Sequence, residues 1–328
     1  MKKGKLLLLS AITLGSFAAM TGCTPEADIG ILQFGAFEAL DNAREGFIDG
    51  LKENGLGHLK IDYKNAQADG ATNQTLATGM AGRHKLNLAI ATPCATALKA
   101  AQENIGSETP LLFTAVTDAV GAGLVNTNDI PGGFTTGSSD AQPQEALTAQ
   151  INLVKQMIPT ATKLGILYTS TETNSVKQAQ LVKPIAEAQG LTVTVSTCTD
   201  QFDINAKALA LANNVDAIWI PTDNTIANNV NKIQEAIGDK HVLLVMGEEG
   251  MVSGGHVSVS IDYYSLGKKT AELAAKILNE NKRAAELPVF LPTIDNCSYV
   301  YSSANLAKAG FDTTLLPTNV SWKNIDSK

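Results

Sequence analysis

Short apolar runs alternate with amphipathic stretches from Ile29 onward, and this alternation constrains the fold more than any other feature. The runs are apolar throughout rather than at every second position, which is typical of strands buried on both faces. The expected strands are Ile29–Phe34, Leu59–Tyr63, Leu88–Ala91, Leu111–Ala115, Leu164–Tyr168, Thr192–Ser196, Ala217–Ile220 and Val242–Met246. The expected helices between them include Ala39–Asn54, Thr96–Asn104, Gln144–Met157, Ser175–Gln189 and Thr225–Ile237. The pattern predicts an α/β fold with parallel sheets covered by helices on both faces.

A change of unit is expected at residues 134–144, where a Gly/Thr/Ser-rich stretch with Pro143 precedes a new helix. A chain of 328 residues with 44% apolar content is long enough for two lobes with separate cores. The late helix Ser265–Asn279 and the strand-like Tyr299–Tyr301 are too few for a third domain, so we expect them to complete the first and second lobe. The lobes then comprise residues 28–140 plus 262–286 and residues 141–261 plus 287–328.

The N-terminal residues have the pattern of a secretory signal. Three lysines within the first five residues precede the apolar run Leu6–Met20, which is shorter than the roughly 20 residues of a membrane-spanning helix. Gly22 and Cys23 follow, as at the cleavage site of a bacterial lipoprotein. We therefore expect a signal peptide over residues 1–22, a lipidated Cys23 and a short tether over residues 23–27. The alternative is an incidental cysteine in an ordinary signal peptide.

Charge and cysteine content exclude several classes of protein. The formal net charge is −7, and loss of residues 1–22 would remove only positive charge, so no nucleic-acid partner is expected. Cys94, Cys198 and Cys297 show no C-x-x-C or Cys/His spacing, so they predict neither a disulfide framework nor a metal site. We interpret them as small buried hydrophobic residues.

Catalytic signatures are missing from the sequence. There is no G-x-S-x-G, H-E-x-x-H, phosphate-binding P-loop or G-x-G-x-x-G pattern, and the four histidines lie apart in positions that suggest surface roles. The adjacent acids Glu248 and Glu249 lack a nucleophile or a metal-ligand set. The sequence therefore predicts a protein that is not an enzyme, with no catalytic residues, no cofactor and no metal.

Polar residues gather where the expected strands end. In parallel α/β sheets the ligand crevice lies beyond the carboxyl ends of the strands. The candidate ligand-binding residues at these ends are Gln33, Phe34, Phe37, Thr92, Cys94, Ala95, Thr114, Thr117, Asp118, Asn174, Ser175, Asp223, Asn224, Glu248 and Asp262. Hydroxyls and amides at helix starts, together with carboxylates, suit a zwitterion.

Each charged end of such a ligand has an expected partner. A helix N-terminus favours a carboxylate, which we place near Thr92–Ala95 or Asn174–Ser175. An ammonium needs an acid, and Asp223 is preferred over Asp118 or Glu248. The alternative for the polar residues is that each only caps its own helix. Phe34 and Phe37 could form the wall of an apolar pocket, or could simply belong to the core and to the start of the following helix.

Several sequence blocks resemble a known family. They include Asn65–Gln67, Ile90–Pro93, Thr114–Asp118, Pro221–Asn224, Gly247–Gly250 and Ile261–Tyr264. In this combination and order, over roughly residues 28–280, the chain resembles substrate-binding lipoproteins of ABC importers for aromatic amino acids, a family with the type I periplasmic-binding fold. Phe37 departs from the family pattern, where His is common, and Cys94 stands where Ala or Ser is usual.

The resemblance implies two Rossmann-like, doubly wound lobes with parallel sheets joined by a three-stranded hinge, and three crossings of the chain between them. It implies a small-molecule ligand, an amino acid, enclosed between the lobes and passed to a membrane permease with a cytoplasmic ATPase. The protein is expected to act as a monomer, held by its lipid on the extracytoplasmic face of the cell membrane.

Other functions remain open at this stage. The ligand could be a branched amino acid, a nucleoside or a sugar, although few aromatic side chains are placed to stack on a sugar ring. The fold could also serve a surface adhesin or receptor. A secreted α/β enzyme is the least favoured alternative, because the catalytic motifs are missing.

Overall fold

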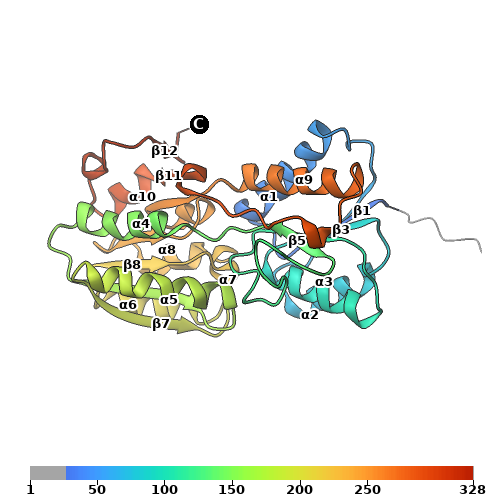
Figure 1. Ribbon diagram of the computed structural model, residues 1–328. Coiled ribbons are helices and arrows are strands. Elements are labelled where there is room, and N and C mark those ends of the chain that lie inside the picture. Colours follow the sequence, from blue (N-terminus) through green and yellow to red (C-terminus); the bar gives the residue numbers. More distant parts are fainter. Residues whose placement is uncertain (1–26, 328) are drawn as a thin grey trace, which may run out of the picture.

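The computed structural model describes residues 27–327 and has two α/β lobes side by side (Figure 1). The first lobe contains a five-stranded sheet in the order β2-β1-β3-β4-β5, and the second a seven-stranded sheet in the order β12-β11-β10-β9-β8-β6-β7. The expected signal peptide, Cys23 and most of the expected tether lie outside the described residues. None of the helices described over residues 27–327 is long and apolar enough to span a membrane.

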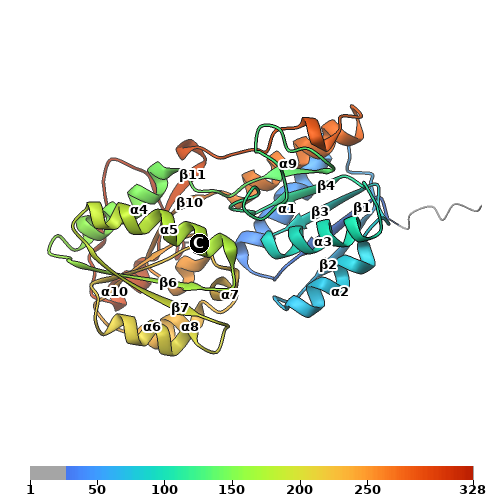
Figure 2. The same ribbon diagram turned by 60° about the horizontal axis from the view of Figure 1, so that its bottom comes forward.

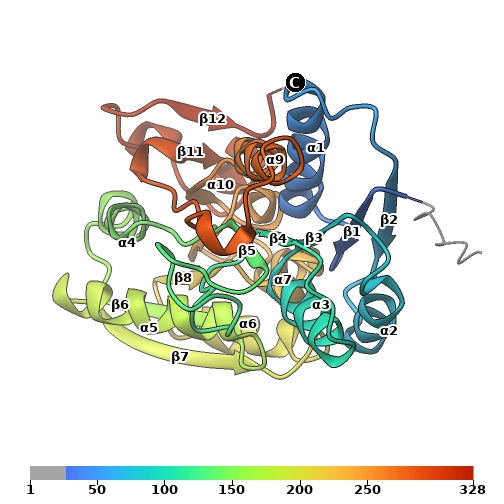
Figure 3. The same ribbon diagram turned by 45° about the vertical axis from the view of Figure 1, so that its right-hand side comes forward.

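All strand pairs of the first sheet are parallel. The strands are β1 (Ile29–Gln33), β2 (Ile61–Asn65), β3 (Leu86–Ile90), β4 (Leu111–Thr114) and β5 (Thr135–Ser138). The helices are α1 (Glu38–Glu53), α2 (Gly70–Met80), α3 (Thr92–Asn104) and the late α9 (Tyr263–Leu278). Helices α1 and α9 cover one face of the sheet, and α2 and α3 the other (Figures 2 and 3). This two-sided cover explains why the central strands β1, β3 and β4 are buried along their whole length.

Helix α9 packs closely along α1 because two glycines lie at their contact. A Cβ on Gly46 would lie 1.9 Å from the backbone oxygen of Tyr264, and a Cβ on Gly267 would lie 2.1 Å from that of Ala43. Only glycine permits so close an approach. The late helix is thereby fixed to the first lobe, far from its neighbours in sequence.

The second sheet is parallel except at one pair, β10 and β11, which is antiparallel. Its strands are β6 (Lys163–Thr169), β7 (Thr192–Cys198), β8 (Ala217–Ile220), β9 (Leu243–Met246), β10 (Val257–Ile261), β11 (Cys297–Tyr301) and β12 (Trp322–Asn324). The expected parallel sheets are confirmed, with this one antiparallel pair as the exception. The chain leaves β10 for the first lobe and returns to β11 at the same edge, so β11 must run in the opposite direction.

Helices on the two faces of the second sheet enclose separate cores. Core residues of α4 (Gln144–Met157), α5 (Thr173–Ala188) and α10 (Ser303–Lys308) pack around Trp219. Core residues of α6 (Ile204–Ala212), α7 (Asn224–Ala227) and α8 (Asn231–Ile237) pack in the other cluster. Four short 3-10 turns complete the described chain: Gly250–Gly254, Ala284–Glu286, Ile294–Asn296 and Thr313–Leu315.

The chain passes between the sheets at three places that are hydrogen-bonded to one another. The Ser139 N–H donates to the Phe290 carbonyl at 2.8 Å, and the Asp262 N–H to the Asn296 carbonyl at 3.1 Å. Leu287 and Val289 pack in the first core. The last crossing therefore follows Phe290, several residues after the expected boundary at 286.

Some elements differ from the expected ones. The start of the expected linker is β5, in which Gly137 lies against the ring of Phe113 and leaves no room for a side chain. The expected helix Thr225–Ile237 is two helices, α7 and α8, and α3 begins at Thr92. Cys94 and Cys198 are buried, whereas Cys297 is half-buried.

One surface expectation is wrong. His256 is buried and accepts the Leu244 N–H at 2.9 Å, and its ring packs against Phe311. Burial lowers the pKa of His256 to about 4, so this histidine is neutral in the folded protein.

Candidate ligand site between the lobes

The segments that follow the strands of the two sheets meet between the lobes. Tyr263, at the second crossing, donates its hydroxyl to Asp140, at the first crossing, at 2.8 Å. The side-chain amide of Gln142 donates to the carbonyl of Gly247 in the second lobe. We call this region the junction and define it by five carboxylates and the residues they contact: Glu38, Asp140, Glu172, Asp223 and Glu248.

Glu248 is the central acid of the junction. It is 2% exposed, and its carboxylate accepts no hydrogen bond from the described residues, although its oxygens are not among the fully enclosed side-chain atoms that lack a partner. Burial, followed by the nearby carboxylates of Asp140 and Glu38, raises the pKa of Glu248 to about 8. A largely buried acid that accepts no hydrogen bond from the protein is available to water or to a bound ligand.

The loop that carries Glu248 is fixed by a chain of buried hydrogen bonds. Trp219 donates to Gln150 at 2.6 Å, and Gln150 donates to Gln142 at 2.7 Å. Gln142 in turn donates to Gly247. The position of Glu248 is therefore set by the core of the second lobe and by the first crossing.

Asp140 was not among the candidates, yet it lies at the junction and is 2% exposed. It accepts hydrogen bonds from Thr117 at 2.9 Å and from Tyr263 at 2.8 Å. Burial raises its pKa, and the two donated hydrogen bonds act in the opposite direction. Its position just after β5 would have identified it, had β5 been recognised as a strand.

Asp223 is engaged by the protein itself. Its carboxylate accepts the Thr169 N–H at 2.6 Å, the Thr169 hydroxyl at 2.9 Å and the Ile226 N–H at 2.9 Å. Asp223 thus caps α7 and ties it to the end of β6. Burial, followed by the negative charge of Glu172, raises the pKa of Asp223.

Glu172 is a second cap for the same helix and was also missed in the sequence. Its two oxygens accept hydrogen bonds from the backbone and side chain of both Asn224 and Thr225, at 2.7–2.9 Å. The candidate Asn224 is therefore held by Glu172. No local sequence signal predicts a contact between residues so far apart along the chain.

The start of α5 is held against the loop after β8. Asn174 donates to the Thr222 carbonyl at 2.8 Å, and Ser175 to the same oxygen at 3.3 Å. No side chain caps the helix, because its N-cap residue, Glu172, directs its carboxylate to α7. The backbone N–H groups of the first turn of α5 remain available to a ligand.

The start of α3 is strained and lacks a side-chain cap. Ala91 has φ 83° and ψ 153°, a conformation almost confined to glycine. Thr92 and Ala95 are buried in the first turn of the helix. Cys94 instead points to α2, where its thiol donates to Asn73 at 3.1 Å. The unusual cysteine therefore contributes to helix packing in the first lobe.

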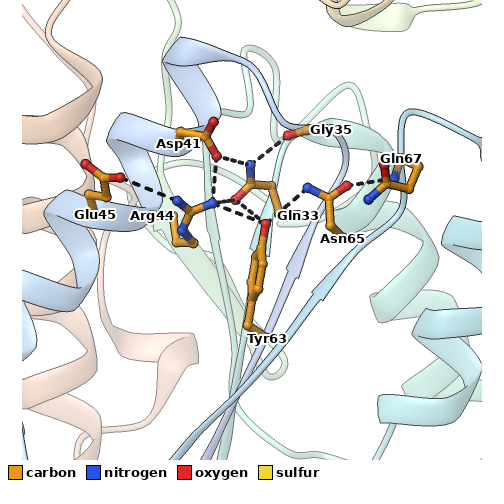
Figure 4. Close-up of polar contacts among 8 residues, drawn as sticks. All are labelled: Gln33, Gly35, Asp41, Arg44, Glu45, Tyr63, Asn65 and Gln67. Atoms are coloured by element: carbon orange, nitrogen blue, oxygen red, sulfur yellow. Dashed lines mark hydrogen bonds and ion pairs between the residues drawn. The ribbon is translucent and has the colours of Figure 1, made fainter.

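Gln33 belongs to a polar network on the first lobe (Figure 4). Its amide donates to the Gly35 carbonyl at 2.7 Å and to Asp41 at 2.9 Å, and its oxygen accepts from Arg44 at 2.9 Å. This network positions the loop between β1 and α1, which carries both candidate phenylalanines. Phe34 lies in the first core, whereas Phe37 packs against cores of both lobes.

The remaining candidates have separate places. The Thr114 hydroxyl is buried without a partner in the described chain, and Thr117 is bound to Asp140. Asp118 accepts the Gly121 N–H at 2.8 Å in a turn of the first lobe. Asp262 caps α9 by accepting the Ser265 N–H and hydroxyl. Within residues 27–327, no group of three or more potential ligands is placed to hold a metal ion.

Known proteins resemble this chain along most of its length. Residues 28–304 match a family model described as ABC transporter substrate binding protein. A protein of Clostridioides difficile (strain R20291), named tyrosine-binding protein, is 33% identical over 291 residues, which cover 87% of this chain and 81% of that protein.

Two solved structures extend the comparison. An ABC domain from Streptococcus pneumonia in complex with L-Trp has a TM-score of 0.82 and 32% identity, and covers 90% of this chain and 97% of its own. The ligand-free, open structure of a Clostridium difficile substrate binding protein with adhesive properties has a TM-score of 0.67 and 31% identity. It covers 91% of this chain and 99% of its own. With two lobes of this architecture and a family match over most of its length, the chain belongs to the ABC transporter substrate-binding proteins.

Proposed function

We propose that this chain is the extracytoplasmic solute-binding subunit of an ABC importer and captures an aromatic L-amino acid between its lobes. The observation that carries this proposal is Glu248, a buried carboxylate at the junction with no donor among the described residues. An amino acid brings the missing cation. The names of the tyrosine-binding relative and of the L-Trp complex support an aromatic side chain.

The lobe arrangement supports a closed, ligand-binding conformation. Identity and coverage are nearly equal for the L-Trp complex and for the ligand-free, open structure, yet the TM-scores are 0.82 and 0.67. Because both structures are almost equally similar to this chain in sequence, the difference in TM-score favours lobes placed relative to each other as in the L-Trp complex. Hinge closure of this kind is usual for periplasmic binding proteins.

We assign the ligand's ammonium to Glu248 in preference to Asp223. Asp223 already accepts three hydrogen bonds from the protein, whereas Glu248 accepts none from the described chain. A buried, unpaired charge is costly, so a cation at Glu248 would be strongly favoured. Asp118 is less suitable, because it lies in a partly exposed turn and binds Gly121.

The other groups of the ligand have candidate partners in both lobes. The uncapped first turn of α5 offers N–H groups to the carboxylate. Helix α3 offers only the Thr92 N–H, because Pro93 has no N–H and the Cys94 N–H donates to the Ala91 carbonyl. Phe37, which reaches both lobes, is placed to contact the aromatic ring. Burial of that ring contributes affinity at roughly 25 cal/mol per Å² of apolar surface.

The remaining parts of the proposal concern the cell. A lipid on Cys23 would hold the protein, as a monomer, on the extracytoplasmic face of the membrane. There it would deliver its ligand to a permease driven by a cytoplasmic ATPase, as membership of the ABC transporter family implies.

Calorimetric titration of ligand-stripped protein with L-Tyr, L-Trp, L-Phe, L-Leu and glucose tests the proposal. We expect the aromatic amino acids to bind most tightly. Ligand at 100 times its Kd should raise the free energy of unfolding by about 2.7 kcal/mol. Binding of only glucose, or of leucine in preference to all three aromatic amino acids, would contradict the proposed specificity.

Three substitutions test the assignment of the ammonium. Glu248→Gln should weaken binding by about 2–5 kcal/mol, or roughly 30- to 4,000-fold. Glu249→Gln is the matched control, because Glu249 already pairs with Lys323. Asp223→Asn should lower the unfolding temperature, because a cap is weakened, and should affect binding less than Glu248→Gln does. Unchanged affinity in Glu248→Gln would remove Glu248 from the site.

A further inference from the structure

The charges gathered at the junction have one sign. The charged groups that most affect Glu248 are the carboxylates of Asp140 and Glu38 from the first lobe, and of Asp223 and Glu172 from the second. In the described part of the chain, none of these five acids takes part in a salt bridge. Glu172, Asp223 and Asp140 accept hydrogen bonds from neutral donors, and Glu248 accepts none from described residues.

This arrangement treats the two ends of an amino acid differently. An ammonium at Glu248 gains attraction from several carboxylates in a buried setting, where the interaction is stronger than in water. A ligand carboxylate is repelled by the same charges. Its candidate partners are the N–H groups of the first turn of α5 and the Thr92 N–H at the start of α3, and each helix start carries only about half a positive charge.

A lysine or arginine that could compensate the ligand carboxylate is not found at the centre of the junction among residues 27–327. Lys323 acts on Glu38 at the edge of the junction and is paired with Glu249. Arg44 is engaged by Asp41 and Gln33 in the first lobe. The ligand carboxylate therefore adds little to the attraction that holds the ammonium.

We infer that the junction also accepts aromatic primary amines, which keep the ring and the ammonium of an aromatic amino acid but lack its α-carboxylate. This inference rests on the proposed function and deepens it. The ammonium is the required group, the ring supplies apolar contact, and the carboxylate is dispensable. Arylalkylamines such as tyramine and tryptamine form the corresponding ligand class.

Matched ligand series separate the contributions of the two charged ends. We propose calorimetry on the ligand-stripped full chain with L-Tyr, tyramine and 3-(4-hydroxyphenyl)propionate, and with L-Trp, tryptamine and indole-3-propionate. Each amine should bind no more than tenfold more weakly than its amino acid, whereas each acid that lacks the amine should bind at least a hundredfold more weakly. An amine more than tenfold weaker than its amino acid would overturn the inference.

Two controls connect the result to the junction. Tyramine should displace bound L-Tyr, and Glu248→Gln should weaken both ligands while Glu249→Gln leaves both unchanged. Failure of displacement, or tyramine binding that is unaffected by Glu248→Gln, would place the amine elsewhere and overturn the inference. If the amino acids bind and the amines do not, only this inference fails. If neither binds, the proposed function fails as well.

Discussion

Glu248 combines two properties at the scale of a single residue: it destabilises the ligand-free fold and is available to a ligand. Its folded-state pKa of about 8 exceeds the ordinary value of a glutamate. The folded protein therefore holds a proton at Glu248 that the unfolded chain has already released. Such a group favours function at the expense of stability.

The pH dependence of stability follows from this shift. Because the folded state binds the extra proton, the contribution of Glu248 to stability is fully present below about pH 4.5 and is lost as the pH rises to about 8. We expect Glu248→Gln to remove this loss, on the order of a few kcal/mol, in the ligand-free protein. Urea unfolding at pH 5.5 and pH 8.5 measures it. Equal pH dependence of wild type and variant would contradict the shift.

Single residues also explain why the site was predicted only in part. The sequence identified Glu248, Asp223 and Asn174 because they follow apolar strands. It could not tell which of the two carboxylates is the better partner for the ligand's ammonium. That depends on which carboxylate oxygens already accept hydrogen bonds, and the donors come from distant residues such as Thr169. Asp140 was missed because β5 was not recognised as a strand, and Glu172 because its partners Asn224 and Thr225 are distant in sequence.

At the scale of elements, the first turn of α1 rests on the 3-10 turn that follows Glu249. A Cβ on Gly250 would lie 2.9 Å from the Cβ of Glu38 and 3.5 Å from the backbone nitrogen of Ala39. These two residues belong to the opposite lobe. The contact therefore exists only while the lobes are together, and glycine allows the approach.

The variant Gly250→Ala should consequently oppose closure without disturbing either lobe. We expect ligand affinity to fall by about 1–3 kcal/mol, the usual cost of an added methyl group in a packed contact, mainly through faster dissociation. Stopped-flow fluorescence would measure the rate. Gly79→Ala in α2, where a Cβ has no neighbour within 4 Å, is the control and should leave affinity unchanged. Equal affinity of Gly250→Ala and wild type would show that the lobes do not close through this contact.

Elements with a strong apolar pattern were predicted well. All eight expected strands are present, and α4 has the expected bounds. The weakly patterned β5 was missed, because its small residues Thr135–Ser138 are held in the sheet by the ring of Phe113 and by β4 rather than by their own apolarity. The break between α7 and α8 lies in a run of asparagines that permits a helix without requiring one.

At the scale of the whole molecule, anchoring is the prediction that depends least on the fold. Replacing Cys23 with Ala should move the protein from the membrane fraction to the medium or the periplasm, because a lipid on that cysteine is the proposed anchor. Fractionation followed by immunoblotting measures the change. Ligand affinity should stay equal, since the candidate site is built from residues 33–262. Retention in the membrane fraction would contradict the anchor.

The one-signed charge of the junction has a consequence for the timing of transport. Without a ligand, closure brings Glu38 and Asp140 of one lobe toward Glu248 and Asp223 of the other. These acids then either repel one another or must take up protons, and both costs oppose the approach. A cationic group reverses the sign of the interaction. In a protein that works as proposed, the ligand-free molecule is therefore disfavoured from adopting the closed conformation of the ligand-bound one. The closed conformation is then populated mainly when a ligand is bound. A permease that responds to this conformation would hydrolyse little ATP without transporting a ligand.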